Sequence, residues 1–199
     1  MPWIGYFAQI ENCDKVIFLD DVQYSRREWQ NRNRIIDRNG KVSFITLNIC
    51  KAPRSTKIKD IKISPDFNHN KFIDKIYQSY KGSVNINNLM DHLSCAFKLS
   101  LEKSDGMLYK LNISLIKYFC NLAKINCDYA LASEINLSEY LIDSATDKLL
   151  SICKKYNAKN YLSSEGAKEY MSKEIYKFDS ANINISWQKF LHNSYININ

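Results

Sequence analysis

The sequence predicts an α/β protein built on an open, mostly parallel sheet with flanking helices, a β-hairpin extension and a central run of helices. Two observations carry this prediction. Short apolar runs rich in β-branched and aromatic residues, typical of buried strands, alternate with longer segments of helical periodicity. Polar residues directly follow the predicted strands at 16–19 and 159–162, where open α/β sheets place their ligands.

The composition is that of a globular protein, and we expect one domain over residues 1–199. Hydrophobic residues make up 45% and charged residues 25%, with five Gly and three Pro, which argues against long flexible linkers. The six cysteines form no Cys-x-x-Cys pair and indicate reduced core residues. With no signal peptide and no apolar run that could span a bilayer, the sequence predicts a cytoplasmic protein.

The first elements are a helix, a strand and a hairpin. A helix beginning near Pro2 precedes the apolar strand at 16–19. Residues 29–36 then alternate in character, and residues 42–49 form a returning strand. Between them lies Asn39-Gly40, a strong hairpin signal.

The rest of the chain alternates helices with short strands. Three successive helices are predicted from apolar residues at helical spacing, at 68–81, 88–101 and 107–123. A further helix opens at Ser144, whose hydroxyl suits an N-cap, with Asp147 in its first turn. The remaining strands are expected at 129–133, 159–162 and 183–187.

Two acidic residues, Asp20 and Asp21, follow the strand at 16–19. A carboxylate at a strand end could bind a metal, act as a base or orient an arginine. Neighbouring residues of an extended chain point in opposite directions, so we expect one of the two to face a site. A structural ion pair with Arg32 or Arg34 is the main alternative.

The net charge of +7 permits nucleic acid, an anionic surface or a phosphorylated small ligand as partner. Many lysines are spread along the predicted helices, whereas four arginines follow the acidic pair within residues 26–34. Arg32 and Arg34 fall on one face of the hairpin strand. Because guanidinium groups bind phosphate and carboxylate in a bidentate manner, this pair predicts an anion site.

A second anion contact is predicted at Ser163, Ser164 and Gly166, which lead from a strand into a helix. Hydroxyls and backbone N–H groups at a helix start can hold an anion, although such serines more often only cap the helix. The nucleotide-binding Gly-rich motifs and a Gly-x-Ser-x-Gly elbow are absent from the sequence. We find no metal-ligand pattern among the histidines and predict no metal site.

Several motifs resemble the WbqC-like protein family. They are PWIGYF at 2–7, FLDDVQY at 18–24, WQNRNRI at 29–35, TDKL at 146–149 and YLSSEG at 161–166. The resemblance covers most of the chain, and the motif at 29–35 adds Trp29 and Asn33 to the predicted substrate-binding residues. It implies a role in bacterial surface-polysaccharide or O-antigen biosynthesis.

From this resemblance we expect a transferase that adds an acyl or aminoacyl group to a nucleotide-activated amino sugar. Its partner would be a small molecule, either a sugar nucleotide or an acyl donor. Asp20 or Asp21 would act on the acceptor amine, Arg32 and Arg34 would hold a pyrophosphate or carboxylate, and Ser163 would hold an acyl or phosphate oxygen.

The family pattern also differs from this chain in ways that keep other functions open. A strand ending in His-Gln-Pro before residue 2 and an apolar segment after residue 199 belong to the family pattern, so we expect a chain truncated at both ends. Ser164 stands where the family prefers Gly. The alternatives are a degenerate, non-catalytic nucleotide-binding paralogue or a basic nucleic-acid-binding protein, and the carboxylates beside the arginines argue against the latter.

Overall fold

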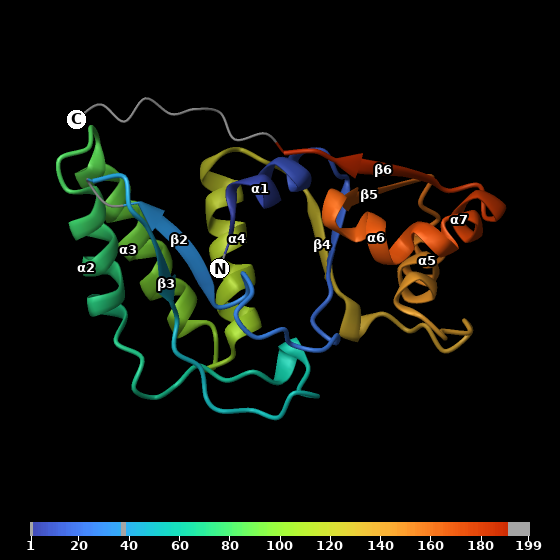
Figure 1. The fold of residues 1–199 in the computed structure, drawn as a ribbon, viewed down its shortest axis with the longest axis horizontal. Coiled ribbons are helices and arrows are strands. Elements are labelled where there is room, and N and C mark those ends of the chain that lie inside the picture. The colour runs from blue at the N-terminus through green and yellow to red at the C-terminus, as the bar shows by residue number, and fades with distance from the viewer. Residues whose placement is uncertain (1, 37–38, 191–199) are drawn as a thin grey trace. The chain divides into compact units, whose positions relative to one another are not determined.

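The computed structural model describes residues 2–36 and 39–190, which belong to two compact units (Figure 1). The described residues of the first unit are 2–7, 20–36 and 39–126, and those of the second are 8–19 and 127–190. Each described unit has its own hydrophobic core. That the whole chain is one domain stays a prediction.

The mixed α/β class is confirmed, but the strands pair differently from the predicted open sheet. The described residues form three separate two-stranded sheets. β1 (Lys15–Phe18) pairs with β4 (Asp128–Leu131) and β5 (Asn160–Ser164) with β6 (Asn184–Gln188), both in parallel, whereas β2 (Arg32–Ile36) pairs with β3 (Val42–Thr46) in antiparallel fashion. The two hairpin strands pair with each other, and the other four strands form two separate parallel pairs.

The first unit packs the β2–β3 hairpin with a helical run that confirms the three predicted helices. These are α2 (His69–Tyr80), α3 (Ile86–Glu102) and α4 (Leu108–Leu122). A short 3₁₀ helix, η1 (Ile58–Asp60), lies in the loop before α2. The Asn68 side chain caps α2 by accepting a hydrogen bond from the Lys71 N–H at 3.0 Å.

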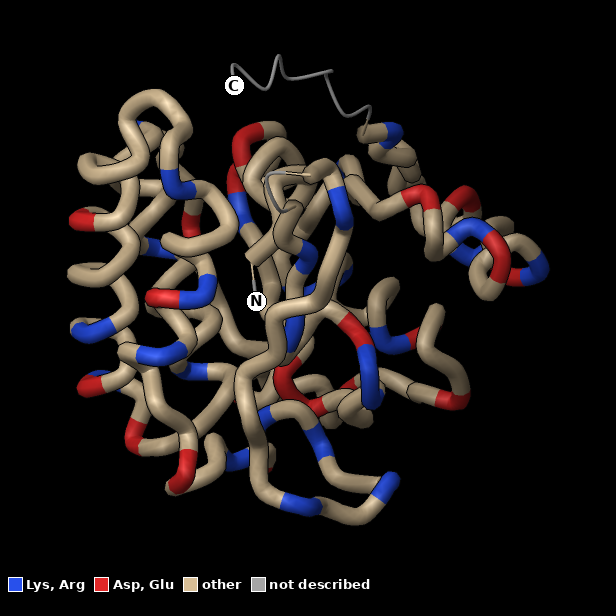
Figure 2. The backbone as a smooth tube through the Cα atoms, turned by 60° about the vertical axis from the view of Figure 1, so that its left-hand side comes forward, with Lys and Arg blue, Asp and Glu red and all other residues tan. Residues whose placement is uncertain are grey.

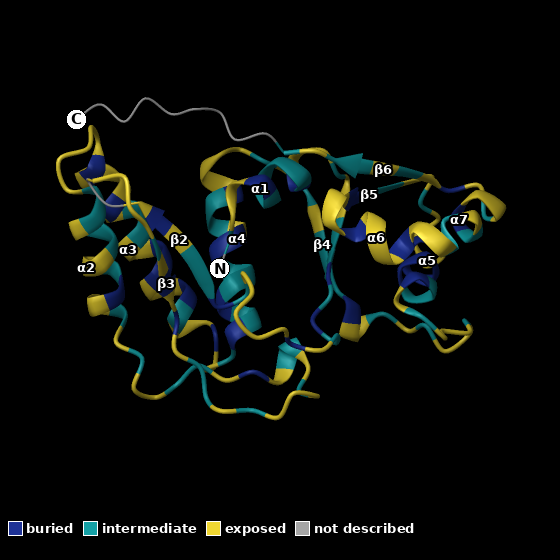
Figure 3. Ribbon diagram, in the orientation of Figure 1, coloured by how far each residue is buried: buried dark blue, intermediate teal, exposed yellow. Residues whose placement is uncertain are grey.

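The core of the first unit is made by side chains from the hairpin and the helices, and Figure 3 colours the buried residues of these elements dark blue. Alternate hairpin residues, Ile35 and Ile45, point into it, and Phe72 and Phe97 meet there with ring centroids 5.2 Å apart. The buried members are Tyr24, Ile35, Ile45, Leu47, Ile61, Phe72, Ala96, Phe97, Leu108, Leu111 and Leu115.

The second unit holds the two parallel strand pairs and a second set of helices. Helix α1 (Ile4–Glu11), of which residues 8–11 belong to this unit, precedes β1, and the 3₁₀ helix η2 (Ala132–Glu134) follows β4. The later helices are α5 (Ala145–Lys155), η3 (Glu165–Ala167), α6 (Lys168–Met171), η4 (Ser172–Glu174) and α7 (Tyr176–Ser180).

The core of the second unit lies among α5, α6, α7 and the β5–β6 pair. Its buried members are Leu149, Leu150, Cys153, Ala167, Met171, Phe178 and Ile183. Tyr161 of β5 stacks on Phe178 of α7 with ring centroids 5.6 Å apart. Among the helices described in both units, none combines the length and apolar character that a bilayer crossing requires.

Candidate functional site

The outer face of the β2–β3 hairpin brings the predicted arginines together. Arg32 lies opposite Thr46, and Arg34 lies opposite Phe44. Side chains alternate along a strand, so these four residues share one face, as predicted for Arg32 and Arg34. The opposite face buries Ile35 and Ile45, which fixes the side that each arginine takes.

Both guanidinium groups of this face lie over aromatic rings. Arg32 Cζ is 4.4 Å from the centroid of Phe44, and Arg34 Cζ is 5.0 Å from the centroid of Trp29 and 5.9 Å from that of Phe44. The Trp29 and Phe44 centroids are 6.5 Å apart. Phe44 is 43% and Trp29 40% exposed, so the rings remain accessible beside the cations. We call Trp29, Arg32, Arg34 and Phe44 the arginine–aromatic face.

The two arginines carry charge that no acidic group of the described residues neutralises. Within residues 2–36 and 39–190, neither guanidinium forms an ion pair or a side-chain hydrogen bond. The Arg32 Nε–H is buried and has no hydrogen-bond partner. A cation–π contact offers a guanidinium electrostatic stabilisation but no acceptor for its N–H groups. The arrangement therefore suits an anionic acceptor.

A buried hydrogen-bond chain holds the preceding segment against the hairpin. The Tyr24 hydroxyl donates to Asn31 Oδ1 at 2.9 Å, and Asn31 Nδ2 donates to the Leu47 carbonyl at 3.0 Å. Burial raises the pKa of Tyr24, while the charges of Arg26 and Arg32 oppose that shift. The hydroxyl therefore remains protonated and donates at neutral pH.

The side chain of Asn33 has a positioning role on the other face of β2. Its Nδ2 donates to the Pro2 carbonyl at 2.8 Å, and its Oδ1 accepts the Arg34 N–H at 2.8 Å. Donor and acceptor are both engaged, so Asn33 ties the start of the PWIGYF motif to the strand that carries the arginines. Its predicted contact with substrate stays a prediction.

The acidic pair lies at a turn that is bonded to η1. Asp20 is 2% exposed, and its carbonyl accepts the Lys59 N–H at 2.7 Å, while Asp21 is half-buried. The alternative of an ion pair to Arg32 or Arg34 does not occur, since neither arginine makes one among the described residues. The catalytic role of the two carboxylates stays a prediction.

Ser163, Ser164 and Gly166 belong to the second unit, and their joining the arginines in one site stays a prediction. Ser163 is buried at the end of β5, whereas Ser164 and Gly166 are exposed. Ser164 makes no side-chain cap bond to the turn that follows. That turn is a 3₁₀ helix of three residues before the four-residue α6, so the helix dipole that favours anions is small here.

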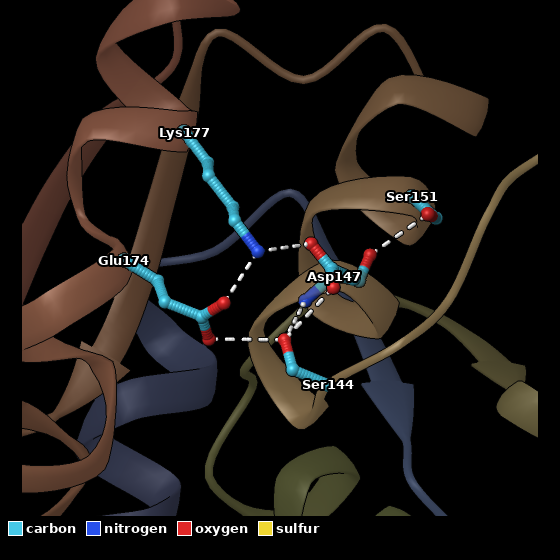
Figure 4. Close-up of polar contacts among 5 residues, drawn as sticks. All are labelled: Ser144, Asp147, Ser151, Glu174 and Lys177. Carbon is cyan, nitrogen blue, oxygen red and sulfur yellow. Dashed lines mark hydrogen bonds and ion pairs between the residues drawn. The ribbon is translucent and has the colours of Figure 1, made fainter.

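The start of α5 is occupied by the protein's own charges (Figure 4). Ser144 Oγ accepts the Asp147 N–H at 3.1 Å, which confirms the predicted N-cap. The same oxygen lies 3.0 Å from a carboxylate oxygen of Asp147 and of Glu174, so its single proton serves one of them at a time. Lys177 bonds both carboxylates, 2.7 Å from Asp147 Oδ1. This helix start is therefore a structural junction.

Charge along the backbone is uneven (Figure 2). The loop at 51–59 carries Lys51, Arg54, Lys57 and Lys59 without an acidic residue, and Arg26 Nη2 donates to the Ala52 carbonyl of this loop at 2.6 Å.

Across the described residues, no group of three or more His, Cys, Asp or Glu side chains is placed to hold a metal ion.

Comparison with known proteins identifies the family. The model of the WbqC-like protein family matches residues 1–198 of the chain. The chain belongs to the WbqC-like protein family. It is 28% identical over 188 residues to "Uncharacterized protein Rv1507c" of Mycobacterium tuberculosis (strain ATCC 25618 / H37Rv), and the match covers 94% of this chain and 77% of that protein. No solved structure matches the chain significantly.

In this WbqC-like protein, the sequence predicted the two arginines and Trp29 as site residues but did not include Phe44, which the structure places on the same face. That residue belongs to the predicted returning strand, and only the pairing register shows that it lies beside Arg34. Glu174 and Lys177 were also missed, because they meet Ser144 and Asp147 from 30 positions away. The observed register is what places Phe44 on this face.

Proposed function

We propose that this WbqC-like protein is a transferase of bacterial surface-polysaccharide biosynthesis. It would add an acyl or aminoacyl group to the amine of a nucleotide-activated amino sugar. The observation that carries the proposal is the arginine–aromatic face, where two guanidinium groups without acidic partners among the described residues lie beside exposed rings. A diphosphate supplies the acceptor atoms that these groups lack.

The proposed roles follow from the chemistry of acyl transfer. Arg32 and Arg34 hold the diphosphate, and Trp29 contributes a ring to the same site. Asp20 or Asp21 orients the acceptor amine and takes the proton that the amine loses as its nitrogen bonds to the acyl carbon. The bond from that carbon to the donor's leaving group breaks, and the leaving group departs with the electron pair and takes up the proton from the carboxylate. Ser163, Ser164 and Gly166 are retained as the proposed contact for an acyl or phosphate oxygen.

Binding of UDP-glucosamine, measured by isothermal titration calorimetry, tests the role of the arginines. Arg32→Ala should weaken binding about tenfold or more, because a charge-assisted hydrogen bond contributes roughly 1.5–3 kcal/mol. Arg54→Ala is the matched control, since it removes the same charge from the exposed loop at 51–59 and should change the affinity less than about twofold. Equal affinity of the wild type and Arg32→Ala would exclude the assigned role.

Turnover tests the carboxylates. With UDP-glucosamine as acceptor and acetyl-coenzyme A as a probe acyl donor, mass spectrometry follows the acetylated product. Asp20→Asn and Asp21→Asn are compared, and the variant that loses product while it still binds UDP-glucosamine identifies the base. Since Asp20 is buried, its variant is checked by circular dichroism. If both variants are folded and fully active, the proposed base is wrong.

A further inference from the structure

The arginines of the chain are concentrated in one region. All six arginines lie between residues 26 and 54, whereas the 22 lysines are spread over the whole chain. Residues 20–62 contain eleven Lys or Arg and five Asp or Glu, which gives +6 of the total charge of +7. A lysine would serve as a general surface cation, but only a planar guanidinium can both stack on a ring and bind phosphate in a bidentate manner.

The outer face of the hairpin changes in character along its length. The pair Arg32–Thr46 provides a cation and a hydroxyl at one end, Arg34–Phe44 follows, and Ile36–Val42 ends the strip. Ile36 is 39% and Val42 54% exposed, and together with Phe44 they leave apolar surface open. A ligand that matches this strip has an anionic end and a flat apolar end.

We propose that this face binds the nucleoside diphosphate part of the substrate, with the base stacked on Phe44 and Trp29 and the diphosphate held by Arg32 and Arg34. The inference rests on the proposed function and assigns the part of the substrate that each residue holds. On binding, phosphate oxygens accept hydrogen bonds from the guanidinium N–H groups, and the base covers the exposed parts of the two rings. The acceptor that the Arg32 Nε–H lacks is supplied in the same step.

Recognition by stacking predicts a site that tolerates different bases. Ile36 and Val42, which continue the face beyond Phe44, carry no side-chain hydrogen-bonding groups and cannot read the edge of a base. Every base has a π-face, so stacking discriminates weakly among bases. UDP and ADP should therefore bind with affinities within about fivefold of each other.

A single nucleotide fits this face better than a nucleic-acid strand. Binding of a strand uses successive aromatic rings, one for each stacked base. Here two rings have centroids 6.5 Å apart and planes tilted by 44°, so they offer a surface for one base and not for a row of successive bases. A strand therefore serves as the competing outcome of the test.

Calorimetry with UDP, ADP and inorganic pyrophosphate separates the two halves of the site. Phe44→Leu should weaken UDP and ADP about tenfold and leave pyrophosphate unchanged, whereas Arg32→Ala should weaken all three. Tyr176→Leu removes another exposed ring, at 62% exposure in the second unit, and should have no effect. Phe44 is exposed, so its variant should fold, and circular dichroism checks this.

A fluorescence experiment reports on stacking directly. Of the three tryptophans, Trp3 and Trp187 are replaced by Phe, so that Trp29 is the only one left. UDP and ADP should quench its emission, and pyrophosphate should not. The inference is overturned if UDP binds without quenching, if Phe44→Leu leaves UDP affinity unchanged, or if an oligothymidylate 15-mer binds more tightly than UDP.

These outcomes are separable from those of the proposed function. Quenching and base-tolerant binding without any transfer of the acyl group would support the inference and contradict the transferase. Transfer that persists in Phe44→Leu with unchanged affinity for UDP-glucosamine would support the transferase and overturn the inference.

Discussion

The hydrogen-bond chain that joins Tyr24, Asn31 and Leu47 supports the arginine–aromatic face, and its contribution to stability can be worked out from the structure. Tyr24 and Asn31 are each 7% exposed, and Leu47 is fully buried. The two side-chain bonds are 2.9 and 3.0 Å long, and the Leu47 N–H also donates to the Asn31 carbonyl at 2.7 Å. Loss of either side-chain bond leaves a polar group unpaired away from water.

Two substitutions remove these bonds by different amounts. Tyr24→Phe removes only the hydroxyl and leaves Asn31 Oδ1 without a donor, which should lower the free energy of unfolding by about 1–2 kcal/mol. Asn31→Ala leaves the Tyr24 hydroxyl and the Leu47 carbonyl unpaired, so its cost should be about 2–4 kcal/mol. When Asn31 is already Ala, Tyr24→Phe removes a hydroxyl that has lost its acceptor, so a coupling of about 1–2 kcal/mol between the two substitutions is expected.

Urea unfolding measures these differences when the signal comes from the first unit. In a Trp187→Phe background, the remaining tryptophans, Trp3 and Trp29, both belong to that unit. The free energies follow from the unfolding midpoint and the slope with denaturant concentration. Tyr176→Phe is the control, because its side chain is 62% exposed and should change the stability by less than about 0.5 kcal/mol.

The reasoning is refuted by either of two results. The first is a Tyr24→Phe variant within about 0.5 kcal/mol of the parent protein, which would mean that the buried hydroxyl has another partner or needs none. The second is simple additivity of Tyr24→Phe and Asn31→Ala, which would mean that the two side chains do not act on each other. A lower slope with denaturant would instead indicate a change in the unfolded state.

Two further predictions concern the second unit. The bond from Lys177 is the largest cause that lowers the pKa of both carboxylates at the start of α5, and those carboxylates in turn raise the pKa of Lys177. The stabilisation that these ion pairs give to the folded second unit should be fully present between about pH 5 and 10. It should decline as pH falls through the lowered carboxylate pKa values, and again as pH rises past the usual lysine pKa. In urea titrations, Lys177→Met should lower the midpoint at pH 7 and flatten the acid decline, and Lys168→Met should do neither. Burial raises the pKa of Cys153 to about 11, so iodoacetamide at pH 8 should label the exposed Cys95 first by mass spectrometry, and equal labelling would contradict this.

In the hairpin, the face on which the arginines lie was predictable from the sequence, but the pairing register was not. Alternation over residues 29–36 correctly placed Arg32 and Arg34 on one face. A two-residue turn at Asn39-Gly40, however, would pair Arg34 with Ile45, whereas the observed partner is Phe44. A shift of the pairing by one residue turns the side chains of a strand to the opposite face. Only the observed register, in which residues 37–41 connect the strands, places an aromatic ring beside the arginines and Ile45 in the core. Residues 37–38 of the predicted turn lie outside the described residues.

Strand existence was predictable, but strand pairing was not. The predicted strands at 16–19 and 159–162 correspond to β1 and β5 with small shifts at their ends. Their partners are chosen by long-range packing, such as the stacking of Phe18 on Tyr129 at 5.6 Å across β1 and β4. No local pattern encodes a contact between residues more than 100 positions apart, so the sequence could not reveal that the strands pair two by two.

Long-range contacts were likewise not predictable at the charged junction at the start of α5. Ser144 and Asp147 are three residues apart and form a local pattern that predicts a cap. Glu174 and Lys177 complete the junction from η4 and α7, and their own spacing of three residues indicates only a helical ion pair. The sequence predicted an N-cap at Ser144, and the structure adds two carboxylates and a lysine to that cap.

The arginine–aromatic face carries two features that cost stability in the free protein, and both point to the same ligand. The buried Arg32 Nε–H lacks an acceptor, and such an unpaired buried donor costs roughly 1–3 kcal/mol. Phe44, Val42 and Ile36 expose apolar surface on the adjoining part of the same face. By contrast, Ile45 of the same strand β3 is buried in the core. A nucleoside diphosphate would relieve both costs together, since its phosphate supplies the acceptor and its base covers the rings. Binding should therefore raise the urea midpoint of the first unit in the wild type and raise it less in Phe44→Leu, as expected when a ligand binds only the folded state.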